Sequence, residues 1–239
     1  MQRQFCEKGG ADMPPKAKYT REEIVQTALE LVSERGICSL NARNLGAALG
    51  TSTRPLFTAF KNMGELSEEV YAAAMKRFEE YASQPDKYNL PFKNVGIQMI
   101  LFASEQPNLF QLLFMSGKQI PQDVQPFLGV KDRPAAGSFD DMLGRLGVTR
   151  TRCMEYIKRD YGLAEREASL LFRSLWLFTY GISTLIANGV CCYNENEVSE
   201  MLSAEFRAVM GLIRSGNAFL TESVQKGTGN SAGSVIQSM

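Results

Sequence analysis

Three basic side chains share a stretch of sequence that contains no acidic residue. Arg43, Arg54 and Lys61 lie between Asn41 and Met63, and serine and threonine hydroxyls accompany them. Cationic and hydroxyl side chains are groups with which proteins hold phosphate. The chain as a whole is neutral, with 26 lysines and arginines against 26 aspartates and glutamates, so any basic surface must be local. This stretch is therefore the best candidate for contact with a polyanion.

The sequence contains no histidine. This absence excludes the Ser-His-Asp and Cys-His nucleophile systems and the commonest general base. It also excludes metal sites that use histidine ligands. Carboxylates and lysines could still do acid–base chemistry, but no paired-carboxylate motif stands out. We therefore expect no catalytic residue, no metal site and no cofactor, in a protein that is not an enzyme.

The cysteines are odd in number, irregularly spaced and without a CxxC motif, which indicates free thiols in a reducing cytoplasm. The adjacent pair Cys191 and Cys192 could sense oxidants or electrophiles, although two residues in a turn at a helix end are the simpler interpretation. The full set is Cys6, Cys38, Cys153, Cys191 and Cys192.

The length and composition suit a soluble protein of one or two domains, because 239 residues with 44% hydrophobic content can bury a sizeable core. The N-terminus lacks an apolar signal segment. The most apolar stretch, 174–187, falls short of the ~18 residues that a membrane span needs. We expect a cytoplasmic protein without membrane contact, and a buried helix over this stretch.

The positions of apolar residues predict an all-α chain. A T-x-x-E capping box at Thr20 opens the first helix, and Gly36 ends it. Asn41 can cap a second helix that ends at Gly50, and Ser52 can cap a short third one. Further helices are expected from about 63 to 81, from Pro91 to about Glu105, from Pro107, over 139–161 as one long helix, over 164–187 and over 195–214.

Four segments follow from this pattern. A flexible N-terminal arm covers 1–18, a helix-turn-helix domain 19–65, a larger helical domain 66–216 and a flexible tail 217–239. A loop rich in proline and glycine interrupts the larger domain at about 117–137.

Two short helices joined by Gly50 and Thr51 predict a helix-turn-helix. Apolar residues at Leu45, Leu49, Leu56 and Phe60 would pack the two helices together, and the polar residues between them would face outward. The N-terminus of the second helix offers amide groups and a positive dipole end to a phosphate, and side chains near it can reach base edges in the major groove. The alternative is an ordinary pair of helices with a solvated basic face.

Residues 24–66 resemble the DNA-binding domain of the tetracycline-repressor (TetR) family. The segment IVQTALELVSERG carries the family's isoleucine, central alanine, apolar pair and closing glycine. The segment NARNLGAALGTSTRPLFTAFKNMGEL follows, without a gap, the family's thr-x-arg-x-ile-ala, gly-val-ser, leu-tyr-x-x-phe and glu-leu landmarks. Phe57 replaces the usual tyrosine, and Ala59 and Met63 also depart from the pattern.

This resemblance implies a role for each matching residue. Arg43, Ser52 and Lys61 would hold phosphates. Thr53, Arg54 and Thr58 would contact the groove, and Arg54 could pair with guanine O6 and N7 through its planar fork. The lysines of the N-terminal arm could also touch phosphates. The expected DNA-binding set is Lys16, Lys18, Asn41, Arg43, Ser52, Thr53, Arg54, Phe57, Thr58 and Lys61.

The C-terminal half resembles one class of the family's ligand-binding domains. The segment WLFTYGISTL is similar to that class's Trp-x-x-x-His-Gly-x-x-x-Leu signature, with Tyr180 in the histidine position. The resemblance implies that the last two helices pair with a second subunit in a four-helix bundle, and the apolar breadth of 170–186 agrees. The expected dimer interface is Leu171, Leu175, Phe178, Ile182, Met201, Phe206 and Met210.

Aromatic and methionine residues of this half could line a cavity for a small apolar or aromatic effector. Plain core packing is the alternative for each of them. The expected pocket residues are Met99, Phe102, Phe110, Phe114, Met115, Met142, Trp176 and Tyr180.

Together these features predict a homodimeric transcription regulator that binds a near-palindromic operator. An effector would favour a conformation with different spacing of the recognition helices, and DNA affinity would fall. Two rivals stay open: a small helical enzyme, and a helical dimerisation or scaffold protein whose helix-turn-helix has lost function.

Overall fold

The computed structural model describes residues 19–85, 89–115 and 139–216, and within these ranges every regular element is a helix. The predicted arm over 1–18, the loop over 117–137 and the tail over 217–239 lie outside the described residues. The helices of the N-terminal part are α1 (Arg21–Arg35), the short 3-10 helix η1 (Ile37–Ser39), α2 (Ala42–Ala48), α3 (Arg54–Ala59) and α4 (Met63–Ala82).

The remaining helices build the larger part of the molecule. They are α5 (Pro91–Glu105), α6 (Pro107–Phe110), the π-helical turn η2 (Gln111–Met115), α7 (Phe139–Gly144), α8 (Gly147–Tyr161), α9 (Glu165–Ala187) and α10 (Glu195–Arg214).

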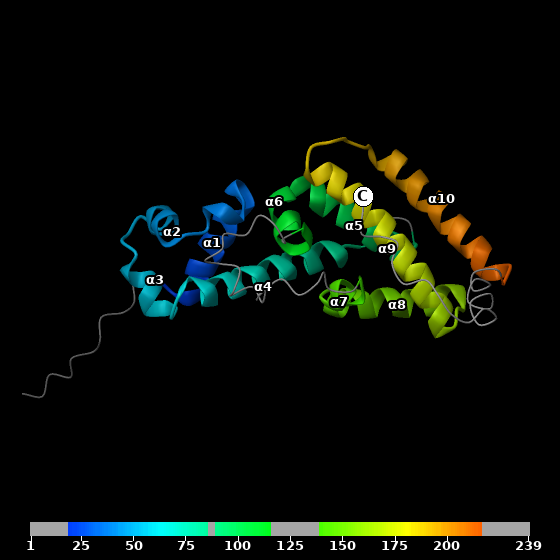
Figure 1. Cartoon of the computed structure of the whole chain (residues 1–239), viewed down its shortest axis with the longest axis horizontal. Helices are drawn as coiled ribbons and strands as arrows, with labels where there is room; N and C mark the ends of the chain where they lie inside the picture. The colour runs from blue at the N-terminus through cyan, green and yellow to red at the C-terminus, as the bar shows by residue number, and fades with distance from the viewer. Residues whose placement is uncertain (1–18, 86–88, 116–138, 217–239) are drawn as a thin grey trace, which may run out of the picture.

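The elements form two groups along the long axis (Figure 1). Helices α1, α2 and α3 make up one end, and α4 runs from this end toward the centre of the molecule, below α6 in this view. Helices α5 and α9 pack side by side at the centre of the other group, with α10 on the outside of α9. A single core cluster runs through both groups, because α4 and α6 both pack against α1.

Several helix ends form as the local sequence predicts. The Thr20 hydroxyl accepts a hydrogen bond from the Glu23 amide at 3.2 Å, and the Glu23 carboxylate accepts one from the Thr20 amide at 2.8 Å. This confirms the capping box, which satisfies two amides that the first turn leaves without partners. Gly36 ends α1 with φ +77°, a backbone conformation that only glycine adopts readily.

Two predicted helices differ in the structure. The expected long helix over 139–161 was wrong: it is broken into α7 and α8, because Gly147 has φ +47° and turns the chain between them. The helix that begins at Pro107 also changes after one turn into a π-helix. At this turn the Tyr180 hydroxyl donates a hydrogen bond to the Phe114 carbonyl at 3.1 Å, which ties the turn to α9.

Helix α9 is long and apolar enough to cross a membrane by length and composition, over 23 residues. The apolar character reaches further than the stretch 174–187 that the sequence singles out. Its buried residues, among them Leu171, Phe172 and Trp176, belong to the core shared with α5 and α8. A central core helix of this kind passes the same composition test, so α9 is explained by packing inside the protein.

Candidate nucleic-acid interface and ligand cavity

Helices α2 and α3 pack as a helix-turn-helix. Leu45, Leu56 and Phe60 are almost fully buried, and Leu49 is buried at the end of α2. These are the residues that the sequence predicts for the contact between the two helices. Because all of them point inward, the remaining polar positions are left on the outer surface.

The turn between the two helices depends on glycine at two positions. A Cβ atom at Gly46 would lie 3.1 Å from the Thr51 carbonyl oxygen, and the Thr51 amide donates to the Gly46 carbonyl at 2.9 Å. Gly50 has φ +62°. The first glycine therefore lets the turn lie directly on α2, and the second lets the chain reverse into α3.

The start of α3 differs by one residue from the expectation. Thr53 occupies the N-cap position, with no hydrogen bond from its side chain to the helix. The Ser52 hydroxyl accepts a long hydrogen bond of 3.4 Å from the Arg54 amide. Asn41 behaves as expected, since its side-chain oxygen accepts from the Asn44 amide at 2.9 Å and caps α2.

The predicted DNA-contact residues of this unit share one property, which is access to solvent. Phe57 is 53% exposed. Thr53 is half-buried, and the Thr58 hydroxyl donates to the Arg54 carbonyl at 3.0 Å. The exposed members are Asn41, Arg43, Ser52, Arg54, Phe57, Thr58 and Lys61. Lys16 and Lys18 lie outside the described residues.

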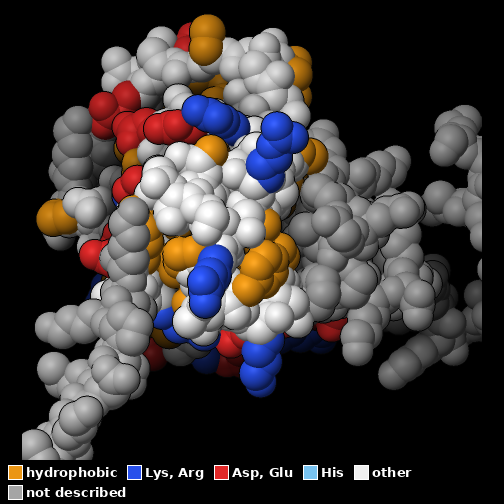
Figure 2. Space-filling view, turned by 90° about the vertical axis from the view of Figure 1, so that its left-hand side faces the viewer, with side chains coloured by type: hydrophobic (Ala, Val, Ile, Leu, Met, Phe, Trp, Pro, Cys, Tyr) orange, Lys and Arg blue, Asp and Glu red, His pale blue; other side chains and the backbone are white. Residues whose placement is uncertain are grey.

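The end of the molecule formed by α1 to α3 carries separate basic side chains on a mostly uncharged face (Figure 2). Hydrophobic side chains lie between them, and acidic side chains gather toward the edge of the view. This agrees with the absence of acidic residues between Asn41 and Met63. The face is therefore locally positive although the whole chain is neutral.

A clamp at Arg21 fixes α3 to its neighbours, and the sequence reasoning missed it. The guanidinium donates to the Ala59 carbonyl at the end of α3, to the Glu65 carboxylate of α4 and to the Glu69 carboxylate of α4. It also lies 4.3 Å from the centre of the Phe60 ring. The signal in the sequence was the pair of acids one helical turn apart, but nothing local indicates which base they meet.

Glu65 connects this clamp to Lys61, which lies two residues before the start of α4. Its carboxylate accepts a hydrogen bond of 2.7 Å from the Lys61 amide and another from Arg21. The Lys61 amide bond is the main reason that the pKa of Glu65 lies below its ordinary value, and Arg21 adds to the effect. The ionised carboxylate thus holds the backbone at Lys61, one of the expected phosphate contacts.

The entry to α1 is attached to the same unit. The Tyr19 hydroxyl donates to the Leu49 carbonyl at the end of α2. Further along, the Ser33 hydroxyl donates to the Gln106 side chain at 2.6 Å, and the Asn108 side chain donates to the Ser33 carbonyl at 2.8 Å. Helix α1 therefore joins the helix-turn-helix to α6 of the larger part.

The residues predicted to line an effector pocket gather mostly into the core. Met99, Phe102 and Phe110 are fully buried. Phe114, Met115, Met142 and Tyr180 are half-buried and pack against the core cluster. Edge-to-face ring contacts join Trp176 to Phe114 at 6.4 Å and Phe114 to Phe78 of α4 at 5.1 Å.

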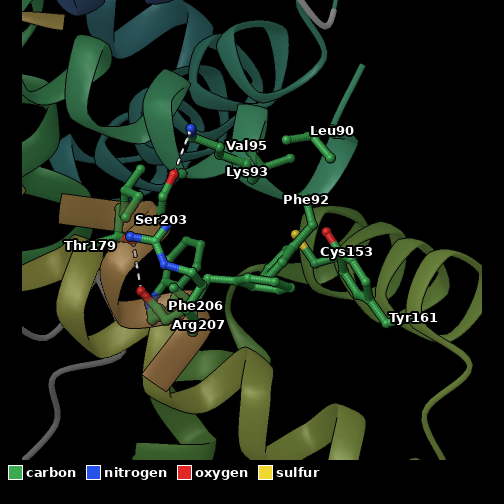
Figure 3. A pocket seen from close by; sticks show the side chains of 14 residues that line it. Leu90, Phe92, Lys93, Val95, Cys153, Tyr161, Thr179, Ser203, Phe206 and Arg207 are labelled. Atoms are coloured by element: carbon green, nitrogen blue, oxygen red, sulfur yellow. Dashed lines mark hydrogen bonds between the residues drawn. The ribbon is translucent and has the colours of Figure 1, made fainter. Parts of the chain in front are cut away.

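A cavity of about 230 Å³ lies elsewhere, between α5, α8, α9 and α10 (Figure 3). Of the predicted pocket residues, Trp176 lines it. The sequence reasoning missed the other lining residues because several come from α10, which it assigned to dimer contact alone. Its wall includes Phe92, Lys93, Gly96, Cys153, Trp176, Thr179, Ser203, Phe206 and Arg207.

The comparisons with known proteins match the chain by structure only. No protein-family model and no curated protein matches its sequence. A solved structure from Mesorhizobium loti, assigned to the TetR family of transcriptional regulators, covers 82% of this chain and 98% of its own at 16% identity, with a TM-score of 0.54. This chain has the TetR fold. SmeT, the repressor of the Stenotrophomonas maltophilia efflux pump SmeDEF, also matches, with 19% identity over 83% of this chain and 91% of its own; its TM-score of 0.42 carries no argument.

Within the TetR fold, the residues predicted for a dimer interface face largely inward. Leu171 is fully buried, and Leu175, Ile182 and Met210 are at most 6% exposed within a single chain. These four side chains therefore pack within the single chain, and the predicted dimer interface stays a prediction. Phe178, Met201 and Phe206 are half-buried.

A different stripe on the same helices is exposed and uncharged. On α9 it contains Leu177 at 57% exposure, Gly181 and Leu185 at 40%. On α10 it contains Ala204, Ala208, Gly211 and Leu212, the last 54% exposed. These residues recur at helical spacing, on a face of each helix next to the one that carries the predicted interface residues.

None of the four described cysteines forms a disulfide bond. Cys191 and Cys192 lie in the turn between α9 and α10. Within the described ranges, no group of three or more histidine, cysteine or acidic residues could hold a metal ion.

Proposed function

We propose that the chain is a cytoplasmic DNA-binding transcription regulator, and that its α2–turn–α3 unit contacts operator DNA. The observation that carries this proposal is the exposed, acid-free surface on a packed helix-turn-helix within the TetR fold. Residues 19–65 form the DNA-binding domain and 66–216 the regulatory domain. No catalytic activity is part of the proposal.

The side chains of this surface divide into two roles. Arg54, at the first turn of α3, reads a base edge, because its planar fork can pair with guanine. Exposed Phe57 meets a thymine methyl or a sugar. Arg43, Ser52 and Lys61 hold phosphates and set the register of the protein on the duplex. Lys16 and Lys18 would add phosphate contacts from the arm.

The protein acts as a homodimer through α9 and α10. The exposed stripe around Leu177, Gly181 and Leu185 faces a copy of itself, and the Ala204–Leu212 stripe does the same. Small residues at Gly181 and Ala208 let helices approach closely. Two recognition helices then enter successive major grooves about one helical turn (~34 Å) apart.

An effector bound in the larger part would release the DNA. The cavity at Trp176 is joined by ring contacts through Phe114 to Phe78 of α4, the helix that carries the Glu65 and Glu69 carboxylates of the Arg21 clamp. A ligand that displaces Trp176 would therefore shift side chains that pack against α4, and through the Arg21 clamp this shift would reach the end of α3. Release requires that the ligand bind the two conformations with different affinity. Repression is the expected outcome of DNA binding.

The test is a gel shift with the DNA upstream of the protein's own gene, across a series of salt concentrations. Binding should weaken steeply as salt rises, since phosphate contacts release counterions. Arg54→Ala should relax base preference, and Lys61→Ala should weaken all sites alike. Lys76→Ala is the matched control for the lysine, because Lys76 is an exposed residue of α4 away from the α2–α3 surface.

The outcome decides between regulator and scaffold. If Lys76→Ala and Lys61→Ala weaken DNA binding equally, the total positive charge governs binding and the α2–α3 surface has no special role. Absence of binding at low salt, to this or any genomic fragment, would refute the proposed function.

A further inference from the structure

Two adjacent thiols lie beside an apolar groove at the connection between α9 and α10. Cys191 and Cys192 belong to the turn that joins these helices, at the upper edge of Figure 1. Neither forms a disulfide bond. Cys192 is exposed and Cys191 is half-buried, so a reagent in solution can reach the pair.

The groove is lined by Cys192 and has a volume of about 110 Å³. Helices α5, α9 and α10 all contribute apolar side chains to it, and Tyr193 lines it as well. The apolar wall consists of Ile97, Ile100, Leu101, Ile186 and Val198. An apolar cavity of ~150 Å³ encloses benzene, so this groove can cover most of one phenyl ring.

Tyr193 connects the second thiol to the same groove. Its hydroxyl donates a hydrogen bond to the Cys191 side chain, and this bond is the main reason that the pKa of Tyr193 lies above its ordinary value. Cys192 therefore lines the groove directly, and Cys191 contacts a residue that lines it. Two sulfur atoms and an apolar wall are neighbours at this turn.

Consecutive cysteines are poorly placed for a disulfide with each other. Their Cα atoms are ~3.8 Å apart across a trans peptide bond, whereas a disulfide usually joins Cα atoms ~4.4–6.8 Å apart. A direct bond between the two sulfurs would therefore strain the backbone. A soft atom that bonds to each sulfur separately leaves the sulfurs further apart, and thiolates are the ligands that soft atoms prefer.

We infer that Cys191, Cys192 and this groove form a binding site for an organic trivalent arsenical, whose arsenic bridges the two sulfurs and whose apolar group lies in the groove. The arsenical, R–As(OH)2, reacts with two thiols to give R–As(S–Cys)2 and two water molecules. Each S–H bond and each As–OH bond breaks, an S–As bond forms, and the thiol proton leaves with the hydroxide as water. Arsenic stays trivalent, so nothing is oxidised or reduced.

The adjacency of the two thiols should make the site selective. Once the first sulfur is bonded, the second reacts within the same molecule, and such a linkage can raise affinity by roughly 10²–10⁴-fold. A single exposed cysteine lacks this gain. The inference does not rest on the proposed function, because it concerns the binding chemistry of the α9–α10 turn alone.

The test uses the full chain with Cys6→Ser and Cys38→Ser, a background that keeps the pair and the buried Cys153. The probe is phenylarsine oxide, which water converts to the dihydroxy form. One equivalent should protect two thiols per chain from N-ethylmaleimide, and the intact mass should show one phenylarsenic group per chain.

Cysteine variants separate bridging from simple thiol reactivity. In this background, Cys191→Ser and Cys192→Ser should each weaken phenylarsine oxide about 100-fold, and excess 2-mercaptoethanol should then remove the probe. Restoring Cys38 is the matched control, since this cysteine is exposed and stands alone, and it should add no tight site. Thermal unfolding of each variant shows that it is folded.

A second set of variants tests the groove. Leu101→Ser should weaken phenylarsine oxide about fivefold and leave inorganic arsenite, which has no apolar group, unchanged. Val148→Ser is the matched control, because Val148 is an exposed apolar residue of α8 that does not line the groove. Equal effects of the two substitutions would overturn the role of the groove.

The thiol count decides whether the pair acts as one site. Protection of one thiol per arsenic atom, or affinity unchanged in both serine variants, would overturn the inference. If N-ethylmaleimide modifies both cysteines but phenylarsine oxide does not bind tightly, the pair is two separate thiols in a turn and the proposed site is refuted.

Discussion

Gly96 gives a prediction in which stability and ligand binding change in opposite directions. It lies inside α5 and lines the cavity, and a Cβ atom there would meet Leu202 Cδ1 and Thr179 Oγ1 at 3.5 Å, an ordinary contact distance. The substitution Gly96→Ala therefore adds a methyl group without a clash. Glycine in a helix interior costs roughly 0.5–1 kcal/mol relative to alanine.

The substitution Gly96→Ala should therefore raise the free energy of unfolding. The helix contribution and partial burial of one methyl group together come to about 1 kcal/mol. For a chain of this size that corresponds to a rise in Tm of roughly 2–4 °C. The same methyl group removes space from the cavity, so an apolar probe such as octanol should bind there more weakly, and Gly96→Val should weaken its binding further.

Thermal unfolding checks the first half of this prediction. A titration with octanol checks the second, followed by the fluorescence of Trp176, the single tryptophan of the sequence, which lines the cavity. Ala72→Gly, on the exposed face of α4, calibrates the helix contribution and should lower stability by about 1 kcal/mol. A fall in Tm for Gly96→Ala would show that the space beside Gly96 is already filled. Higher stability with undiminished octanol binding would place the probe elsewhere.

Three further predictions concern the DNA-binding end and the dimer. Gly46→Val should destabilise the turn and abolish DNA binding, because the Thr51 carbonyl leaves no room for the side chain; normal binding in a gel shift would contradict this. The pKa of Glu65 is lowered in the folded state, so the stability that its carboxylate contributes is present above its unfolded pKa near 4.5 and is lost as pH falls through the folded value. Glu65→Gln should therefore flatten the pH dependence of Tm in this acidic range. An unchanged pH profile of Tm would refute the clamp. Leu177→Glu should yield monomers in size-exclusion chromatography with light scattering, whereas a dimer that persists would move the interface away from α9.

The features that could be predicted from the sequence are those set by neighbouring residues. Thr20 and Asn41 form their caps within three residues, and the spacing of Leu45, Leu56 and Phe60 fixes which side of the helix-turn-helix is buried. Such signals need no knowledge of the rest of the chain.

The features that escaped prediction depend on distant contacts. Arg21 meets Glu69 across 48 positions, and no local pattern connects them. The cavity depends on where α10 lies over α5. The residues predicted for a dimer interface show the same limit, because Leu171, which is buried in the single chain, and Leu177, which is exposed, are equally apolar in the sequence. Hydrophobic spacing marks the faces that avoid water, but it does not tell burial within one chain from burial between two.

The measurement that tests the central claim most directly is the salt dependence of DNA affinity for the wild type and Lys61→Ala, followed by fluorescence anisotropy of upstream DNA. The proposed function predicts a steep linear fall of log affinity with log salt, and a slope reduced by about one in the variant, since one phosphate contact is lost. An unchanged slope in Lys61→Ala, or no binding by the wild type at low salt, would contradict the assignment of the α2–α3 surface to DNA.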